Sequence, residues 1–278
     1  MKYLLSLHSH TSSFSHLIFF TKNKKQYLKK LISLLFKKAT PEKTIILGIT
    51  NSNDNGHYQQ IVKLTRNLPK TYKIDYSYKD HFISLTYKNK KIYLVKTDEI
   101  GTDKGHILVV GFKGKIKKRT LKEVLRGAKK QKCIVIANHP LHEFRVPHFL
   151  FEKVFHVKKP ISLSEKSLRN YKKSFDALEL NDYFSEDWKK IKAFARKNKL
   201  PVVSDSDAHF IDEIFQSWYE TEKLDFSSPK KFKKSLKKSF KKGLKLHARP
   251  LGFEAKYKHA LQILLGGYGR KLGIIKTS

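Results

Sequence analysis

The sequence predicts an α/β fold, because short apolar runs typical of buried strands alternate with longer segments of helical periodicity. A hydrophobic content of 40%, with 19 Phe and 13 Tyr, is enough for a sizeable core despite 30% charged residues. Several of the apolar runs end directly at His, Asp, Glu or Asn residues. A length of 278 residues suits one large domain or two small ones.

The first half of the chain is expected to be rich in strands. We predict strands at residues 3–7, 44–50, 72–78, 81–87, 91–96 and 107–111. Helices are predicted at 24–39 and 57–67. In the first helix, apolar residues recur at helical spacing opposite a face of lysines.

Strands and helices alternate more regularly in the second half. We predict strands at residues 133–137, 177–180 and 201–204. Helices are predicted at 120–131, 143–156, 164–173 and 185–198, with prolines interrupting this part of the chain.

The segment after residue 210 has a different composition, and lysines dominate it. Ser228 and Pro229 are a good helix start, with Ser as N-cap and Pro at the first position. Phe232, Leu236 and Phe240 then recur every four residues. We interpret this segment either as an outer helix with a solvated lysine face or as an electrostatic platform for a phosphate backbone. Binding to a membrane surface is a third alternative, and a final helix is predicted at 255–265.

The charge balance favours a polyanionic partner. The formal net charge is +35, from 59 Lys and Arg against 24 Asp and Glu. Because the lysines are spread over the whole chain, the same surplus also fits a generally lysine-rich surface. The single cysteine, Cys133, lies in an apolar run and excludes an internal disulfide framework. With no signal-peptide pattern and no apolar stretch of about 18 residues, we expect a cytoplasmic protein outside the membrane.

Histidines and carboxylates at the predicted strand ends are the candidate functional residues. His8 and His10 are two apart on an extended backbone, so their side chains point the same way. If the strands form a parallel barrel, their C-terminal ends open onto one face and the polar side chains meet there. The candidate metal ligands are His8, His10, His16, Glu99, His106, His139, Asp207 and His209. Imidazoles and carboxylates suit Zn, Mn or Fe, and two such metals bridged by a carboxylate are a common centre for phosphoester hydrolysis.

The order of these motifs resembles the PHP (polymerase and histidinol phosphatase) family. The matching segments are His8-Ser9-His10, Asp98-Glu99 with Gly105-His106, Ala137-Asn138-His139-Pro140, Ala177 to Asn181, and Ser206-Asp207-Ala208-His209. The resemblance runs from residue 8 to 209. It implies a distorted (β/α)7 TIM-like barrel, formed by residues 1–222, with a basic helical C-terminal extension at 223–278 packed on the barrel or completing it.

The resemblance also implies two or three divalent metal ions. His8, His10, Glu99 and Asp207 would hold one ion, and Glu99 would bridge to a second ion held by His106 and His139. His16 and His209 match ligands of a third site. The residues implied to act in catalysis are His8, His10, Glu99, His139, Asp207 and His209.

The chain departs from the family pattern after the second strand. Thr50-Asn51-Ser52 stands where the family usually has Thr-Asp-His, so the third metal site lacks an expected histidine. His57 either replaces it or begins the next helix as an exposed residue. Asp205 and Glu179 are candidates for orienting ligands, and Asn138 is expected to cap a turn. Arg145 is a candidate phosphate contact, whereas His81, His148, His156, His247 and His259 lack a motif context.

We therefore expect a metal-dependent phosphoesterase whose substrate is a nucleotide, a nucleic acid or another phosphate ester. The alternative is a basic nucleic-acid-binding protein on a barrel that has lost catalysis, which the missing Asp-His pair favours. A metal hydrolase acting on C–N bonds is a third hypothesis, but the sequence has no lysine in an evident bridging position.

Overall fold

The computed structural model describes residues 1–10, 24–52, 56–114, 120–142 and 160–252. In these residues eleven strands form one mixed sheet, in the order β11-β10-β1-β2-β5-β6-β7-β8-β9, with β4 paired to β5 and β3 to β4. The strands are β1 (Lys2–Ser6), β2 (Lys43–Ser52), β3 (Lys73–Asp75), β4 (Phe82–Tyr87), β5 (Lys90–Thr102), β6 (Gly105–Val110), β7 (Ile134–Ala137), β8 (Ala177–Asn181), β9 (Val202–Asp205), β10 (Trp218–Thr221) and β11 (Lys245–His247).

The sheet is strongly curved and nearly closes into a barrel. Just beyond the ends of β1 and β9, Ser9 and Ala208 form a parallel bridge, and the His10 N–H donates to the Ala208 carbonyl at 2.7 Å. This seam brings the first strand of the chain to the last parallel strand. The structure confirms the α/β class and the distorted barrel.

Antiparallel strands are the source of the distortion. β1, β2 and β5 are mutually parallel, as are β7, β8 and β9. β6 is antiparallel to both β5 and β7, and β10 is antiparallel to β1. The C-terminal ends of six strands and the N-terminal end of β6 therefore lie at the same edge of the barrel.

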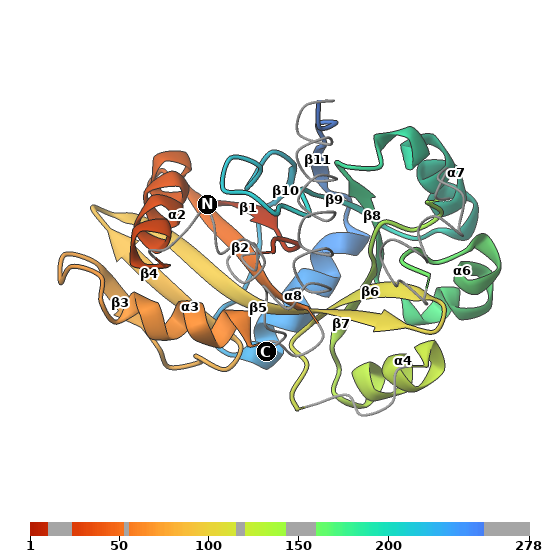
Figure 1. The fold of residues 1–278 in the computed structure, drawn as a ribbon, viewed down its shortest axis with the longest axis horizontal. Helices are drawn as coiled ribbons and strands as arrows, with labels where there is room; N and C mark the ends of the chain where they lie inside the picture. Colours follow the sequence, from red (N-terminus) through yellow and green to blue (C-terminus); the bar gives the residue numbers. More distant parts are fainter. Residues whose placement is uncertain (11–23, 53–55, 115–119, 143–159, 253–278) are drawn as a thin grey trace, which may run out of the picture.

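Helices cover the two sides of the curved sheet. They are α2 (Lys24–Lys38), α3 (His57–Thr65), α4 (Leu121–Lys130), α6 (Glu165–Tyr171), α7 (Trp188–Asn198) and α8 (Pro229–Lys241), with short 3-10 turns at Lys172–Ser174 and Ser185–Asp187. Figure 1 shows α2 and α3 on one side of the molecule, α4, α6 and α7 on the other, and α8 between them. None of the described helices is both long enough and apolar enough to span a membrane.

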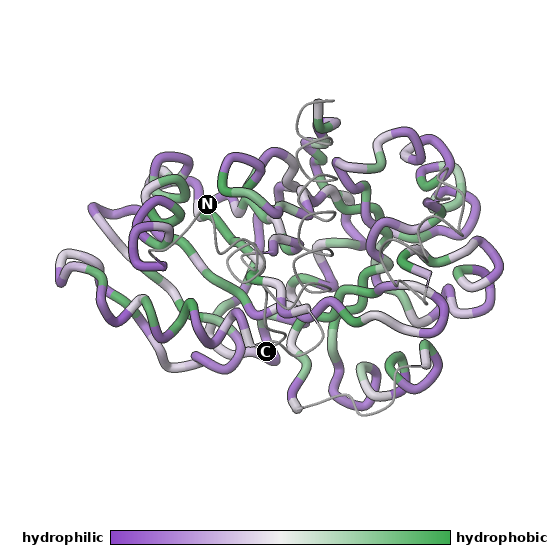
Figure 2. The backbone as a smooth tube through the Cα atoms, viewed as in Figure 1, coloured by the Kyte–Doolittle hydropathy of each residue, from purple (hydrophilic) through white to green (hydrophobic). Residues whose placement is uncertain are grey.

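The core follows the alternation of side chains along the strands. Ile45 and Leu47 of β2 pack outward in a cluster with α2 and α3, whereas Ile46 points inward. A second outer cluster joins β6, β7 and β8 to α4, α6 and α7. Figure 2 shows the resulting pattern, with hydrophobic strands inside and largely hydrophilic helices outside.

Helix α8 fills the inner face of the barrel. The Ser228 hydroxyl caps the helix by accepting a hydrogen bond from the Lys231 N–H at 3.2 Å, and Pro229 occupies the first turn, as predicted. The buried side chains of Phe232 and Leu236 join the cluster formed by the inward residues of the strands. The apolar stripe therefore packs inside the barrel, which corrects the expectation of an outer helix, while its lysines remain at the surface.

Two further predictions are corrected by the structure, and two short strands are additional to those predicted. Glu99 was expected just past a strand, but β5 continues to Thr102 because it pairs with β2, β4 and β6 along its length. The strand predicted at 72–78 ends at Asp75, whose carboxylate accepts hydrogen bonds from Ser77 in a turn. Strands β10 and β11 were not predicted. The helices predicted at 143–156 and 255–265 lie outside the described residues.

Candidate metal centre

The two histidines after β1 meet the aspartate after β9 at the seam of the barrel. The Nε2 atoms of His8 and His10 are 3.0 Å apart. Oδ1 of Asp207 lies 3.1 Å from Nε2 of His8 and 3.2 Å from Nε2 of His10. All three side chains are buried, and the seam itself fixes their separation.

A second group lies beside the first. Glu99 on β5, His106 at the start of β6 and His139 just after β7 converge at one point. Oε1 of Glu99 lies 3.0 Å from Nδ1 of His106 and 3.3 Å from Nε2 of His139. The antiparallel β5–β6 pair produces this arrangement, because its register places His106 opposite Gly101, two residues from Glu99.

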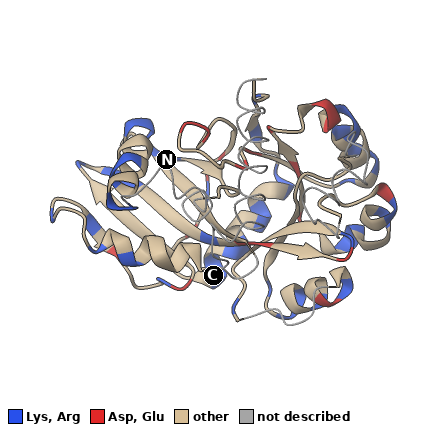
Figure 3. Cartoon of the chain, viewed as in Figure 1, with Lys and Arg blue, Asp and Glu red and all other residues tan. Residues whose placement is uncertain are grey.

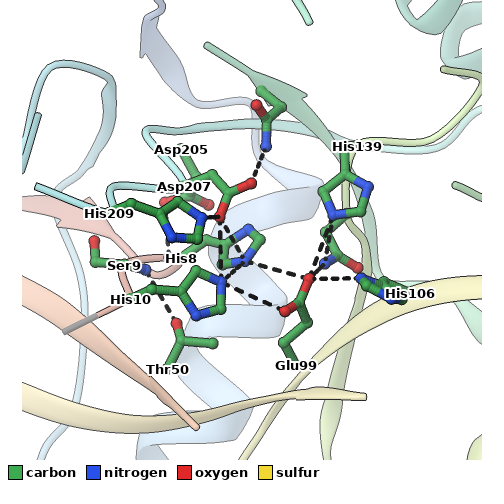
Figure 4. A network of polar contacts seen from close by, with 12 residues as sticks. His8, Ser9, His10, Thr50, Glu99, His106, His139, Asp205, Asp207 and His209 are labelled. Carbon is green, nitrogen blue, oxygen red and sulfur yellow. Dashed lines mark hydrogen bonds and ion pairs between the residues drawn. The ribbon is translucent and has the colours of Figure 1, made fainter. Parts of the chain in front are cut away.

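Glu99 joins the two groups. Its Oε2 lies 3.4 Å from Nε2 of His10, and its Oε1 lies 3.8 Å from Nε2 of His8. Figure 4 shows the carboxylate between the first group and the His106–His139 pair, with the imidazoles turned toward it. One carboxylate is thus in reach of four histidines.

Several hydrogen bonds orient these side chains from behind. Glu179 on β8 is the most connected of these partners: its Oε1 lies 2.7 Å from Nδ1 of His8, and its Oε2 accepts the His139 N–H at 2.7 Å. The Asn181 amide donates to Oδ2 of Asp207 at 2.9 Å. The further orienting contacts are Asn138 Nδ2 to Glu99 Oε1 at 2.9 Å and Ser52 Oγ with His10 Nδ1 at 3.0 Å.

The charges of the site are strongly coupled. Burial lowers the pKa of His8, but the Asp207, Glu179 and Glu99 carboxylates outweigh burial and hold this pKa well above its usual range. Burial raises the pKa of Glu99, but His106 and His10 outweigh it and hold the pKa of this carboxyl well below its usual range. The pKa of Asp207 is lowered in the same way, chiefly by His8 against burial. The carboxylates are therefore held ionised in spite of their burial.

The arrangement fits a cation better than a set of hydrogen bonds. Because Nδ1 of His8 faces the Glu179 carboxylate, it keeps its proton. The raised pKa holds a second proton on Nε2, and a cation would displace that proton and take up the Nε2 lone pair. That lone pair faces Nε2 of His10 and Oδ1 of Asp207, which has no well-directed hydrogen bond. Three atoms that can each offer a lone pair converge here in a buried place. Such a set is suited to act as the ligands of a divalent metal ion.

The backbone is strained at two of these positions. His139 has a φ of 31° and Asp207 a φ of 46°, a backbone conformation that residues other than glycine rarely adopt. Such strain persists only where the surrounding structure enforces it, and it concentrates at functional sites. The Glu179 bond to the His139 N–H and the seam next to Asp207 supply that enforcement.

His209 and His16 complete the predicted ligand set. Nε2 of His209 lies 3.6 Å from Oδ1 of Asp207, and its ring stacks on that of His10 with centroids 4.7 Å apart. His16 lies outside the described residues. The structure thus brings together seven of the eight predicted ligands: His8, His10, Glu99, His106, His139, Asp207 and His209.

The residues that depart from the family pattern have their own contacts. The Asn51 amide donates to Asp98 Oδ1 at 3.0 Å and its oxygen accepts the Tyr58 N–H at 2.9 Å, so Asn51 ties β2 to α3. His57 begins α3 as predicted, but it is buried, which corrects the expectation of an exposed residue.

Two other residues, Asn138 and Asp205, make contacts that the sequence did not reveal. Asn138 was expected to cap a turn, whereas its amide donates to Glu99. Asp205, a candidate orienting residue, accepts hydrogen bonds from the backbone N–H groups of Leu7 and His8 and so anchors the end of β1.

The histidines outside the motifs either contact a carboxylate away from the centre or lie outside the described residues. His142 lies 2.8 Å from Asp187 Oδ2, and His247 pairs with Glu220 at 2.9 Å. Arg145, His148, His156 and His259 are outside the described residues.

Comparisons with known proteins support the resemblance seen in the motifs. A family model described as PHP-associated matches residues 186–239. No curated protein matches the chain in sequence. The crystal structure of PsfC from Pseudomonas syringae PB-5123 has a TM-score of 0.58 at 13% identity, covering 98% of this chain and 99% of PsfC. That likeness shows a shared fold.

Two other structures are similar over shorter parts. The lesion-specific endonuclease PfuEndoQ from Pyrococcus furiosus has a TM-score of 0.47 at 15% identity, covering 88% of this chain and 58% of PfuEndoQ. A proposed metal-dependent phosphoesterase from Bifidobacterium adolescentis has a TM-score of 0.41 at 12% identity, covering 75% of this chain and 87% of that one.

Proposed function

We propose that this chain, a relative of the PHP (polymerase and histidinol phosphatase) proteins with a PHP-associated segment at residues 186–239, is a metal-dependent phosphoesterase. The observation that carries the proposal is the position of Glu99 between two groups of ligand atoms. A carboxylate shared by two such groups is the usual core of a dinuclear hydrolytic centre.

The two groups define which residues would hold which ion. His8, His10 and Asp207 would hold the first, His106 and His139 the second, and Glu99 both. Nitrogen and oxygen donors without thiolate favour Zn, Mn or Fe. When bound, such ions supply Lewis-acid polarisation of a phosphoryl oxygen and make water a stronger acid.

The chain's own residues prepare the centre for this chemistry. Glu179 fixes the ring of His8, and Asn138 and Asn181 hold the Glu99 and Asp207 carboxylates with their oxygens turned inward. His209 and His106 are the most open members of the set, with about a quarter of each side chain exposed (27% and 26%). We assign them to the mouth of the centre, where His209 contacts the phosphate ester.

The substrate class follows from charge. With a net charge of +35, the molecule attracts phosphate-rich compounds, and we propose a nucleotide or nucleic acid as the substrate. The second candidate function is a nucleic-acid-binding protein without catalysis. It rests on Asn51 and Ser52, which occupy the place of the family's Asp-His pair and bond to Asp98 and His10 instead of offering a further imidazole.

The deciding experiment measures metal content and hydrolysis together. Purified protein is assayed by elemental analysis and then with Mn²⁺ on a generic phosphodiester, a phosphomonoester and 5′-labelled RNA. His8→Ala and Asp207→Ala are expected to lose bound metal and at least about 100-fold in turnover. His247→Ala, which removes a histidine paired with Glu220 away from the centre, is the matched control and should behave as the unmodified protein.

Two results would contradict the proposal. Full activity in both His8→Ala and Asp207→Ala, with unchanged circular dichroism, would exclude this centre. Absence of metal and of turnover in the unmodified protein, combined with binding of RNA that a chelator does not affect, would favour the binding protein.

A further inference from the structure

A hollow among the described residues is lined by fourteen residues, of which seven are lysines. It has a volume of about 990 Å³ and lies between the N-terminal half of α8 and the segments before β4, after β6 and before β7. No Asp or Glu of the described residues lines it. We call it the lysine basin and define it by Lys113, Lys129, Lys132, Lys230 and Lys234.

The lysine basin lies at the opposite end of the barrel from the metal centre. Ile134, the first residue of β7, lines the basin, whereas His139 lies just beyond the other end of that strand. Gly111 follows the end of β6, and His106 is at its start. At about 3.3 Å per residue, the two sites are separated by roughly 15 Å of strand. The basin therefore belongs to no part of the proposed hydrolytic site.

Two other lysines hold the wall of the basin in place. Lys233 donates from Nζ to the Gln131 carbonyl at 3.0 Å, and Lys237 pairs with Asp176 at 2.6 Å. Lys233 also passes close to Gly111, where a side chain would collide with its stem. These contacts tie α8 to the ends of β6 and β7 and leave the five basin lysines exposed, without a described carboxylate partner.

The electrostatic effect of the basin is visible on its one histidine. Burial is the main cause that lowers the pKa of His81 from 6.5 to about 4, and the charges of Lys113 and Lys233 contribute to the same shift. The positive charge of the basin therefore comes from its lysines and not from His81. Such a concave cluster of one sign concentrates counter-ions.

The lysines continue beyond the basin along α8. At 13 residues this helix is about 20 Å long, and exposed lysines recur from Lys230 to Lys241. Figure 3 shows basic residues on α8 and on the neighbouring α4. A single phosphate or nucleotide is much shorter than this row, whereas duplex DNA carries one charge about every 1.7 Å of its axis. The length of the row therefore favours a polymer.

The chemistry of the lining favours a phosphate backbone. Lysine is a point charge without the bidentate geometry that reads bases. Among the described residues, no Arg, Phe, Tyr or Trp lines the basin, so none of them offers a ring on which a base could stack. A membrane surface is less suitable, because the only large hydrophobic residue exposed among the described ones is Met1. We propose that the lysine basin and the exposed face of α8 bind the sugar-phosphate backbone of nucleic acid, independently of sequence and of the metal centre.

The test measures binding without hydrolysis. Fluorescence anisotropy with labelled 20-nucleotide single strands and 20-base-pair duplexes is recorded in EDTA between 50 and 200 mM salt. The variant Lys129→Ala/Lys132→Ala/Lys230→Ala/Lys234→Ala is expected to bind at least about tenfold more weakly. The slope of log K against log salt should fall by about three to four, because each lost phosphate contact removes about one from it.

A variant of equal charge provides the control. Lys24→Ala/Lys25→Ala/Lys29→Ala/Lys30→Ala removes four exposed lysines from α2, on the other side of the barrel. It should keep most of the affinity. Equal weakening by both variants would show a general charge effect and overturn the proposal, as would binding of the basin variant at the original affinity. Thermal unfolding of both variants checks that they are folded.

Two further arms separate this proposal from its alternatives. Adding Mn²⁺ in place of EDTA should leave the loss of affinity in the basin variant unchanged, because the basin does not need the metal centre. Failure of hydrolysis would thus leave this proposal standing. Vesicles containing anionic lipid are the competing surface: if the basin variant loses vesicle binding but not nucleic-acid binding, the basin is a membrane contact and the proposal is wrong.

Discussion

Oε1 of Glu179 lies 2.7 Å from Nδ1 of His8, although 171 residues separate the two in the chain. Its other oxygen accepts the backbone N–H of His139, so one carboxylate positions residues of both ligand groups. A carboxylate behind a histidine fixes the tautomer and makes the imidazole a stronger ligand.

Glu179→Gln should therefore weaken metal binding without unfolding the protein. The amide has the same size and its oxygen can still accept the His139 N–H, but the negative charge behind His8 is lost. We expect metal affinity to fall by about 10- to 100-fold, measured by titration with a competing chelator. Unchanged affinity would mean that Glu179 only fills space in the barrel.

Ser52→Ala tests the residue that stands in place of the family's histidine. The Ser52 hydroxyl is 3.0 Å from Nδ1 of His10, so its removal leaves that ring free to turn. We expect up to about a tenfold loss of metal affinity. Ser52→Thr keeps the hydroxyl and serves as the control; a similar loss in both variants would point to packing.

Metal removal should lower the thermal stability of the chain. The ionised carboxylates and the imidazoles of the centre lie within hydrogen-bond distance of one another, and a bound cation stabilises only the folded state. At a free metal concentration 100 times the dissociation constant, the gain is about 2.7 kcal/mol for one site. Differential scanning fluorimetry with EDTA and then Mn²⁺ or Zn²⁺ measures it. The shift should disappear in His8→Ala, and equal shifts in both proteins would contradict the assignment.

Gly48→Ala should disrupt the pairing of β1 with β2. A Cβ at Gly48 would overlap the backbone carbonyl of Leu7, immediately before the first ligand. Overpacking against backbone costs about 3 kcal/mol or more, which chemical denaturation would detect. Gly127→Ala on α4 is the matched control, because its Cβ would meet Phe112 at an ordinary 3.7 Å and alanine favours a helix by about 1 kcal/mol. Gly48→Ala is expected to lower the free energy of unfolding, and Gly127→Ala is expected to raise it.

Asp182→Asn should change how stability depends on pH. Burial raises the pKa of Asp182 from 3.8 to about 8, although a hydrogen bond from the Ser217 hydroxyl opposes this shift. The folded protein therefore keeps a proton that the unfolded chain releases, and this contribution to stability is lost as pH rises from about 4 to 8. The slope is at most about 1.4 kcal/mol per pH unit. The Asn variant lacks this proton uptake. Its free energy of unfolding in urea, relative to that of the unmodified protein, should therefore rise between pH 5 and 8. Parallel stability curves would contradict this assignment.

The sequence predicted the elements that carry the motifs better than those that close the barrel. The strand ends at His8 and Asp207 follow apolar runs bounded by polar residues, and both strands are present. Strands β10 and β11 have only four and three residues and mixed polarity, so pairing with β1 and with each other defines them. Periodicity cannot reveal a strand that exists only through its neighbours.

The candidate site was also predicted only in part from the sequence. Ligand types and order were visible in the motifs, whereas the orienting contacts were not. Asn138 follows a strand like any turn residue, and only the folded chain brings its amide to Glu99, 39 residues earlier. Whether these residues act as assigned stays a prediction that the variants above will test.

The seam between Ser9 and Ala208 also has a consequence for biosynthesis. His8 leaves the ribosome long before Asp205, 197 residues later, is added to anchor its backbone. The emerging chain therefore exposes a bare pair of imidazoles throughout most of translation. The ligand set is complete only when β9 docks beside β1, so in the proposed centre metal binding would follow the closure of the barrel.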